Sequence, residues 1–310
     1  MAGLLPARIR IVTSPTAPHA GLPLAAAGLV VGGLICQEVG AGVAATLFPQ
    51  VGALGMVALR LGFSAIILLI AFRPSVRGRR RSDWATVIGF GLVLGLMNGL
   101  FYEAIARIPL GTAVTIEFIG PLVLSVVMSR RASAWLWAVL ALAGVALLGR
   151  QGFESLDPVG VAFAIAAGGM WVGYILLSAR TGRRFAKLDG LAIAMTVGAV
   201  VTIPFGAASA GPTLIAPHVL LFGLAVAVLS SAIPYGLELL ALRRLPSATF
   251  SILLSLAPAL AALAGLMILH QALDWLDALA IAFVIVASMG AVRAAARRQE
   301  PPVAQAELTP

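Results

Sequence analysis

Charged residues are scarce in this chain. Asp, Glu, Lys and Arg make up only 11% of its 310 residues, while 61% are hydrophobic. A soluble domain carries about 25% charged residues, so most of this surface must face lipid. Because an apolar helix of roughly 20 residues crosses a bilayer, ten spans fit between residues 22 and 292. Their short connections leave no room for a soluble domain.

Cysteine and histidine are rarer still, which excludes several kinds of site. The single cysteine, Cys36, cannot form an internal disulfide. The three histidines, His19, His218 and His270, fall at expected span ends. The sequence therefore offers no buried histidine cluster for a metal ion, and no cofactor is expected. An enzyme would need a convergent nucleophile and base, which we do not find, so enzymatic activity is not expected either.

The apolar segments predict an all-α integral membrane protein with ten transmembrane helices. The expected spans are about 22–45, 53–72, 84–105, 111–128, 135–149, 158–178, 190–208, 217–241, 247–269 and 275–292. The organisation that follows is a cytoplasmic N-terminal tail (1–21), a five-helix repeat (22–150), an external linker (151–157), a second five-helix repeat (158–292) and a cytoplasmic tail (293–310).

Recurring residues favour an internal repeat whose second copy is inverted. Arg107, Pro109 and Pro121 recur as Arg244, Pro246 and Pro258, always 137 residues later. The pair Gly32–Gly33 recurs as Gly168–Gly169, 136 residues later. Since each copy has an odd number of spans, the second copy must cross the membrane in the opposite sense. Inverted repeats are typical of transporters that bind substrate near the bilayer midplane.

The positive charge indicates topology rather than a nucleic-acid partner. The net charge is +9, but most basic residues lie in the alternate loops that share a side with both termini. Cytoplasmic loops are enriched in Lys and Arg, so we expect both termini to be cytoplasmic. The sequence has no basic groove interleaved with aromatic residues, and no nucleic-acid binding is expected.

Ionisable residues inside membrane spans are energetically expensive, so each one suggests a function. Five fall there: Glu38, Arg60, Glu103, Glu117 and Glu238. Glu103 lies near the external end of its span and is expected to pair with Arg107, four residues on. Glu38 and Arg60, in neighbouring spans, either neutralise one another as charge partners or bind the two ends of a zwitterion.

Glu117 is the leading site candidate because a proline follows it by four residues. Pro121 cannot donate a hydrogen bond to the Glu117 carbonyl, so the helix should bend or open there. A carboxylate beside freed carbonyls suits an ammonium group or a proton. Burial in a medium of low dielectric favours the neutral form of a carboxyl, as reversible protonation requires. The alternative is that Glu117 is a structural partner of Arg60.

The eighth span carries a second polar face. Ser231, Tyr235 and Glu238 are spaced by four and three residues, so they share one side of a helix that Pro234 is expected to kink. We expect them to form the wall of a polar pocket, with Glu238 as a second candidate for proton coupling. The alternative is that Glu238 reaches toward Arg243–Arg244 at the cytoplasmic end.

Further substrate-binding candidates come from three other spans. In the third span, Asn98 and Tyr102 lie four residues apart and share a face. In the first span, Gln37–Glu38 follows a run of small residues. In the sixth span, Trp171 and Tyr174 lie beside the position equivalent to Gln37–Glu38, where they either close over a substrate or pack.

Three prolines are expected to act as hinges: Pro121, Pro234 and Pro258. Pro258 occupies the position in the ninth span that Pro121 occupies in the fourth. However, the ninth span has Leu254 where the first copy has Glu117. The repeat is therefore symmetric in fold and asymmetric in charge, as an asymmetric substrate would require.

At these residues the chain resembles the drug/metabolite transporter superfamily, with two EamA-type domains, and within it the bacterial inner-membrane exporters of threonine and homoserine. The resemblance covers nearly the whole chain. It is carried by residues 47–52 (LFPQVG), 57–61 (VALRL), 117–121 (EFIGP), 234–238 (PYGLE) and 244–250 (RLPSATF). It implies proton-driven export of small neutral amino acids across a bacterial inner membrane. One departure is Ala257, where many relatives carry Glu before the ninth-span proline.

The favoured function is therefore a secondary exporter of small neutral amino acids of the threonine/homoserine class, coupled to protons and working by alternating access. The alternative is export of other metabolites, aromatic amino acids or drugs. Few aromatic residues lie at midplane positions, which disfavours recognition of cationic drugs. An intramembrane enzyme or a scaffold is least favoured. The expected partners are a small-molecule substrate, a proton and the lipid bilayer.

Overall fold

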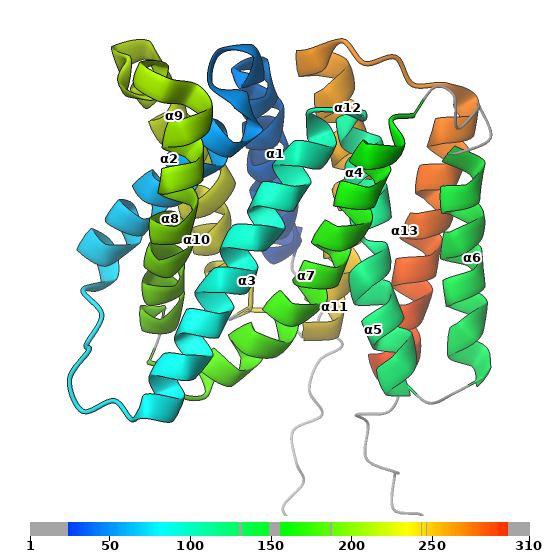
Figure 1. Ribbon diagram of the computed structural model, residues 1–310. Helices are drawn as coiled ribbons and strands as arrows, with labels where there is room; N and C mark the ends of the chain where they lie inside the picture. The colour runs from blue at the N-terminus through cyan, green and yellow to red at the C-terminus, as the bar shows by residue number, and fades with distance from the viewer. Residues whose placement is uncertain are drawn as a thin grey trace, which may run out of the picture.

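The computed structural model describes residues 24–129, 132–148, 156–186, 188–242, 244–245 and 247–296, which form a bundle of helices (Figure 1). The first half contains α1 (Leu24–Thr46), α2 (Phe48–Phe72), α3 (Arg81–Ile105), α4 (Leu110–Glu117), α5 (Ile119–Ser129) and α6 (Ala132–Leu148). The second half contains α7 (Pro158–Gly182), α8 (Asp189–Ala210), η2 (Gly211–Ile215), α9 (Pro217–Ala227), η3 (Val228–Ala232), α10 (Ile233–Leu242), α11 (Ser247–Leu254), α12 (Ala257–Leu269) and α13 (Trp275–Ala296).

The all-helical membrane fold expected from composition is confirmed. Within the described ranges there is no strand. Eight helical stretches are long and apolar enough to cross a membrane, and Trp135–Leu147 and Trp275–Ala291 are apolar but shorter. Both expected tails lie wholly or largely outside the described residues, as does most of the 151–157 linker.

One expected span boundary was wrong. The second span was expected to start at residue 53, but α2 begins at Phe48. Pro49 lies in its first turn, where the missing N–H is harmless. Gly52 has φ 71°, a value that favours glycine, and it bends the helix instead of delaying its start.

Each of the three hinge prolines lies in the first turn of a helix that follows a break. Pro121 follows the break between α4 and α5, and Pro258 follows the break between α11 and α12. Pro234 follows the π-helical turn η3, which separates α9 from α10. The helix breaks expected at Pro121 and Pro234 are therefore confirmed, and three spans are discontinuous near their middles.

The two ends of the bundle differ in charge. The end at the bottom of Figure 1 carries the arginine-rich loops after α2 and α7, together with the last turn of α13. We call it the basic end and the other one the opposite end. Within the described loops of the opposite end, Arg107 is the one Arg or Lys. It pairs with Glu103 and lies 3.8 Å from a carboxylate oxygen of Asp157, which also caps α7.

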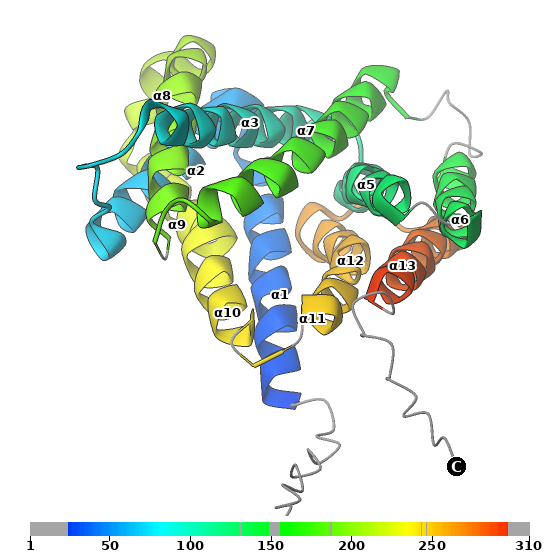
Figure 2. The same ribbon diagram turned by 90° about the horizontal axis from the view of Figure 1, so that it is seen from below.

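Helices from the two halves pack in matching pairs. Figure 2 shows α1 between α10 on one side and α11 and α12 on the other, and all three contact it. In the same way α7 contacts α3 on one side and α4 and α5 on the other. α2 packs against α8, and α6 packs against α13. Most of the helix contacts thus join the first half to the second.

The loops of the basic end also join the two halves. The Nη1 of Arg79, after α2, donates to the Arg184 carbonyl at 2.8 Å. The Nη1 of Arg184, after α7, donates to the Ser82 carbonyl at 2.7 Å. The Arg79 guanidinium also lies over the Phe185 ring, 4.5 Å from its centroid. We call these three contacts the polar latch, and they join the loop after α2 and the first turn of α3 to the loop after α7 at the basic end.

Candidate functional site

The break between α4 and α5 places Glu117 in the interior of the bundle, with 8% of its surface exposed. Pro121 cannot donate to the Glu117 carbonyl, and Gly168 of α7 packs directly on that carbonyl. A Cβ on Gly168 would lie 2.6 Å from the Glu117 carbonyl oxygen, and a Cβ on Gly120 would collide with the Gly168 carbonyl. Two backbones therefore meet here with no side chain between them.

The π-helical turn η3 brings a second freed carbonyl to the interior. Pro234 cannot donate to the Ser230 carbonyl, which lies four residues earlier. The Nη2 of Arg60, from α2, donates to this carbonyl at 3.2 Å. π-Helical turns are frequent at functional sites, and this one links the second span to the second half of the chain.

Arg60 is the one arginine or lysine that the described part of the chain buries, with 9% of its surface exposed. Its Nη1 donates to the Tyr102 hydroxyl at 3.3 Å, and its Nε has no hydrogen-bond partner. Among the described residues, no carboxylate oxygen lies within 4.0 Å of its guanidinium nitrogens. Arg60 thus presents a buried positive charge with a free donor.

Two buried carboxyl groups lie in the field of this guanidinium. Glu38 of α1 is 3% exposed and interacts electrostatically with Arg60. Glu117 interacts electrostatically with both. We call Glu38, Arg60 and Glu117 the central charge cluster. Because the cluster contains no contact ion pair, its charges are open to the two ends of a zwitterionic ligand.

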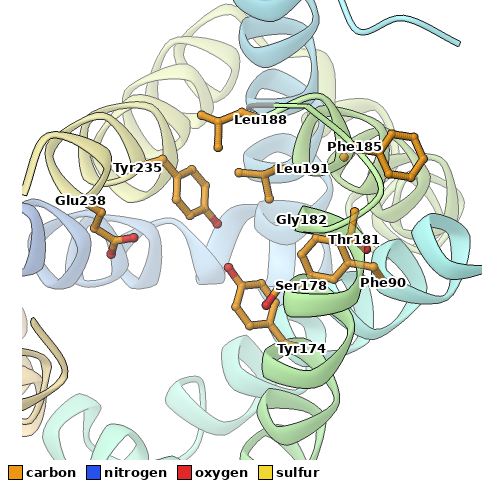
Figure 3. A pocket seen from close by; sticks show the side chains of 11 residues that line it. Phe90, Tyr174, Ser178, Thr181, Gly182, Phe185, Leu188, Leu191, Tyr235 and Glu238 are labelled. Atoms are coloured by element: carbon orange, nitrogen blue, oxygen red, sulfur yellow. The ribbon is translucent and has the colours of Figure 1, made fainter. Parts of the chain in front are cut away.

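A cavity of about 240 Å³ opens at the basic end, and we call it the inner cavity. Figure 3 shows the hydroxyls of Tyr174 from α7 and Tyr235 from α10 pointing toward one another in it. Phe90 of α3 packs on Tyr174, with ring centroids 5.2 Å apart. Glu238 also lines the cavity and interacts electrostatically with both tyrosines. Fully buried Ser231 does not line it.

A second cavity, of about 730 Å³, lies at the opposite end, and we call it the outer cavity. Phe48 lines it, and its ring lies 5.6 Å from that of fully buried Tyr102. Glu103 and Arg107 line it as well and form an ion pair. The pairing expected for Glu103 is therefore confirmed.

The central charge cluster lines neither of these cavities. Toward the outer cavity, Tyr102 separates them, since it contacts Phe48 on one side and Arg60 on the other. Toward the inner cavity, Tyr235 lines the cavity wall and interacts electrostatically with Arg60. The buried charges are thus enclosed by aromatic side chains toward both ends.

The structure separates the expected site residues into groups. Tyr102 joins the central charge cluster, while Tyr174, Tyr235 and Glu238 gather at the inner cavity. Trp171 packs edge-on against Phe118 at the α4–α5 break, with ring centroids 4.8 Å apart. Asn98 and Gln37 line neither cavity. Asn98 donates to the Leu94 carbonyl of its own helix at 2.9 Å, and Gln37 is half-buried.

Two other expectations concern Glu238 and bound metal. Glu238 faces the inner cavity. Of its two alternative partners, Arg244 is exposed and forms no ion pair with it, and Arg243 lies outside the described residues. In the part of the chain that the structure describes, no three His, Cys, Asp or Glu side chains gather closely enough to hold a metal ion.

Two buried serines close to Arg60 were not among the predicted site residues. Ser64 follows Arg60 by four residues and shares its helix face, so the spacing was a usable signal. Ser230 precedes Pro234 by four residues, the same relation that singled out Glu117 before its proline. Thr181 of the inner cavity carried no comparable signal, since its place in the lining depends on how α3, α7, α8 and α10 are arranged around the cavity.

This arrangement, with buried charges enclosed between cavities at the two ends of a membrane bundle, defines a small-molecule transporter. Residues 158–293 match the EamA-like transporter family. The chain is 41% identical over 271 residues to the threonine/homoserine exporter RhtA of Salmonella typhimurium, which covers 87% of this chain and 91% of that protein. It is 42% identical over 253 residues to the exporter RhtA of Escherichia coli K12, which covers 81% and 85%.

The chain belongs to the EamA-like transporter family. Its curated relatives are exporters rather than enzymes. A solved protein structure shares the fold, with a TM-score of 0.58 and 18% sequence identity, over 88% of this chain and 99% of that one. At this identity the likeness concerns the fold alone.

Proposed function

We propose that the protein is a secondary exporter of small neutral amino acids of the threonine and homoserine class. The names of its curated relatives support this substrate class. The observation that carries the proposal is the buried guanidinium of Arg60, which lies in the field of Glu38 and Glu117 without a contact ion pair. A free amino acid carries the complementary pair of charges.

In the proposed complex, the substrate carboxylate binds Arg60 and the ammonium lies between Glu38 and Glu117. A planar guanidinium suits a carboxylate, and such charge-assisted hydrogen bonds are about twice as strong as neutral ones. The Tyr102 hydroxyl accepts a hydrogen bond from Arg60 on the side of the guanidinium that faces the outer cavity. The other proposed contacts form as the cavities open, and they come from Gln37, Asn98, Trp171, Tyr174, Ser231, Tyr235 and Glu238.

Proton coupling is supported by the charges of the cluster. Two carboxyl groups lie in the field of one guanidinium, so either a proton or an ammonium group satisfies the surplus negative charge. Buried charges need such compensation. Because proton and substrate then compete for Glu117, loading one releases the other, as an antiporter requires. Glu238, which lines the inner cavity, is proposed to exchange the proton with that side.

The proposed topology is ten spans in two inverted repeats (22–150 and 158–292), in a bacterial inner membrane with both termini cytoplasmic. The packing of α1 between α10 and α11–α12 supports the repeat, because α7 packs in the same way between α3 and α4–α5. The arginines of the basic end support a cytoplasmic location for that end. The halves would then rock so that the two cavities reach the cluster in turn.

Flux measurements in proteoliposomes test the proposal. Purified full-length protein is reconstituted with an imposed pH gradient, and threonine and homoserine fluxes are compared for wild type, Glu117→Gln and Glu238→Gln. Asp277→Asn is the control, since the Asp277 carboxylate accepts a hydrogen bond from the Asp274 N–H in the turn before α13 and lines neither cavity. We expect gradient-driven flux in wild type and control, and its loss in Glu117→Gln.

Two results would contradict different parts of this proposal. A folded wild type that moves dyes or aromatic amino acids, but neither threonine nor homoserine, would refute the substrate class. Flux that remains dependent on the pH gradient in both carboxyl variants would refute the coupling scheme.

A further inference from the structure

Unpaired polar atoms gather around Arg60. Within the described residues, five buried side-chain nitrogen or oxygen atoms lack a hydrogen-bond partner. Four of them are the Nε of Arg60 and the hydroxyls of Ser64, Ser230 and Ser231. The fifth, in Thr181, lines the inner cavity. Native proteins leave few buried polar groups unpaired, so four such groups on elements that meet at Arg60 need an explanation.

Hydroxyls elsewhere in the bundle behave differently. Four of them donate to the carbonyl four residues earlier, at 2.6–3.2 Å: those of Thr115, Thr196, Thr202 and Ser255. This local bond is the simplest way to satisfy a hydroxyl in a helix that no water reaches. The three serines near Arg60 are 0–2% exposed and do not use it.

The serines approach Arg60 from two elements. Ser64 lies one helical turn along α2, on the same face as Arg60. Ser230, in η3, accepts a hydrogen bond from Arg60 through its carbonyl, while its hydroxyl packs against Gly40, two residues beyond Glu38. Ser231 follows it in the same π-helical turn. These unpaired hydroxyls therefore come from two elements, α2 and η3, which meet at Arg60.

We infer that Ser64 and Ser231 recognise the side-chain hydroxyl of the substrate and so select hydroxylated amino acids. The inference rests on the proposed function, because it assumes an amino acid at the central charge cluster. A serine hydroxyl both donates and accepts, so it can pair with the hydroxyl of threonine or of homoserine. A site built to bond a hydroxyl rejects analogues that lack it, because its own polar groups are then left unpaired.

Specificity measurements test this inference. The full-length protein in proteoliposomes is assayed with threonine, homoserine, 2-aminobutyrate and valine. Threonine and homoserine carry a side-chain hydroxyl, 2-aminobutyrate lacks it, and valine has a methyl group in place of the threonine hydroxyl. We expect wild type to prefer threonine over 2-aminobutyrate by about tenfold or more, as the loss of one buried hydrogen bond predicts. Ser64→Ala and Ser231→Ala should each lower that ratio severalfold by slowing threonine more than 2-aminobutyrate.

Ser255→Ala is the matched control, because Ser255 is 2% exposed but already bonded to the Ser251 carbonyl at 3.2 Å. It should leave the ratio unchanged. A ratio that Ser64→Ala and Ser231→Ala leave unchanged, while wild type still transports threonine, overturns the inference but not the proposed function. Absence of flux for all four amino acids in folded wild type overturns both.

A second measurement uses wild type alone, so it does not depend on whether the variants fold. Threonine and 2-aminobutyrate are added at equal concentrations and the melting temperature is measured in detergent. We expect the larger rise with threonine, because the better ligand stabilises the folded state more. Equal rises with both amino acids would overturn the inference.

Discussion

A single methyl group on Gly168 should impair transport, because Gly168 supports the open turn at Glu117. A Cβ there would lie 2.6 Å from the Glu117 carbonyl oxygen and 3.4 Å from its carbonyl carbon. Ordinary C···O contacts are about 3.3 Å or longer, so α7 and α4 must separate by roughly 0.7 Å. Both atoms belong to backbone in packed helices, so no side-chain rotation absorbs the shift. Overpacking of this kind costs about 1–3 kcal/mol.

Gly169→Ala is the matched control. A Cβ on Gly169 would meet no atom within 4 Å, so alanine there gains helix propensity, about 1 kcal/mol, without the collision. We expect Gly168→Ala to melt below Gly169→Ala in detergent and to transport threonine about tenfold more slowly or worse, as misplaced binding groups do elsewhere. Equal melting temperatures and equal flux would refute the argument that this backbone contact positions Glu117.

Three further predictions follow from single contacts. Tyr102→Phe leaves a buried donor of Arg60 unpaired, so the free energy of unfolding in detergent should fall by about 1–3 kcal/mol; no change would show that the bond is dispensable. Glu103→Gln removes a partly exposed ion pair and should change the free energy of unfolding by less than about 1 kcal/mol; a larger loss would contradict its peripheral role. Arg184→Ala removes the hydrogen bond from Arg184 to the Ser82 carbonyl and leaves the Arg79 contacts of the polar latch in place. The loosened latch should let a cysteine placed at Ser178 in the inner cavity react faster with thiol reagents; an unchanged rate would show that this hydrogen bond does not control access.

The helix breaks could be predicted from the sequence because proline removes one specific hydrogen bond. The positions of Pro121 and Pro234 predict which carbonyls become free, those of Glu117 and Ser230. What occupies a freed carbonyl could not be predicted in the same way. The Ser230 carbonyl accepts from Arg60 only because α2 packs against η3, and no local pattern in the sequence specifies that contact.

Glycine was harder to interpret than proline. The second span was expected to start just after Gly52, but this glycine bends a helix that is already under way. Gly168 was recognised as part of a repeat, yet its packing on the Glu117 carbonyl emerges only when α7 and α4 are placed together. A glycine's role depends on which backbone approaches it, and that information is tertiary.

The two halves share their helix breaks but not their charges. Glu38, Arg60 and Glu117 all come from the first half. The second half has Leu254 at the position equivalent to Glu117. Among the described residues Arg60 makes two hydrogen bonds, and of these the one to the Ser230 carbonyl crosses to the second half. In the proposed cycle, the guanidinium and the carboxylates that hold the amino acid therefore keep their spacing while the two halves move relative to one another. The substrate carboxylate competes with the Ser230 carbonyl for Arg60, so binding weakens the one hydrogen bond that ties the cluster to the moving half.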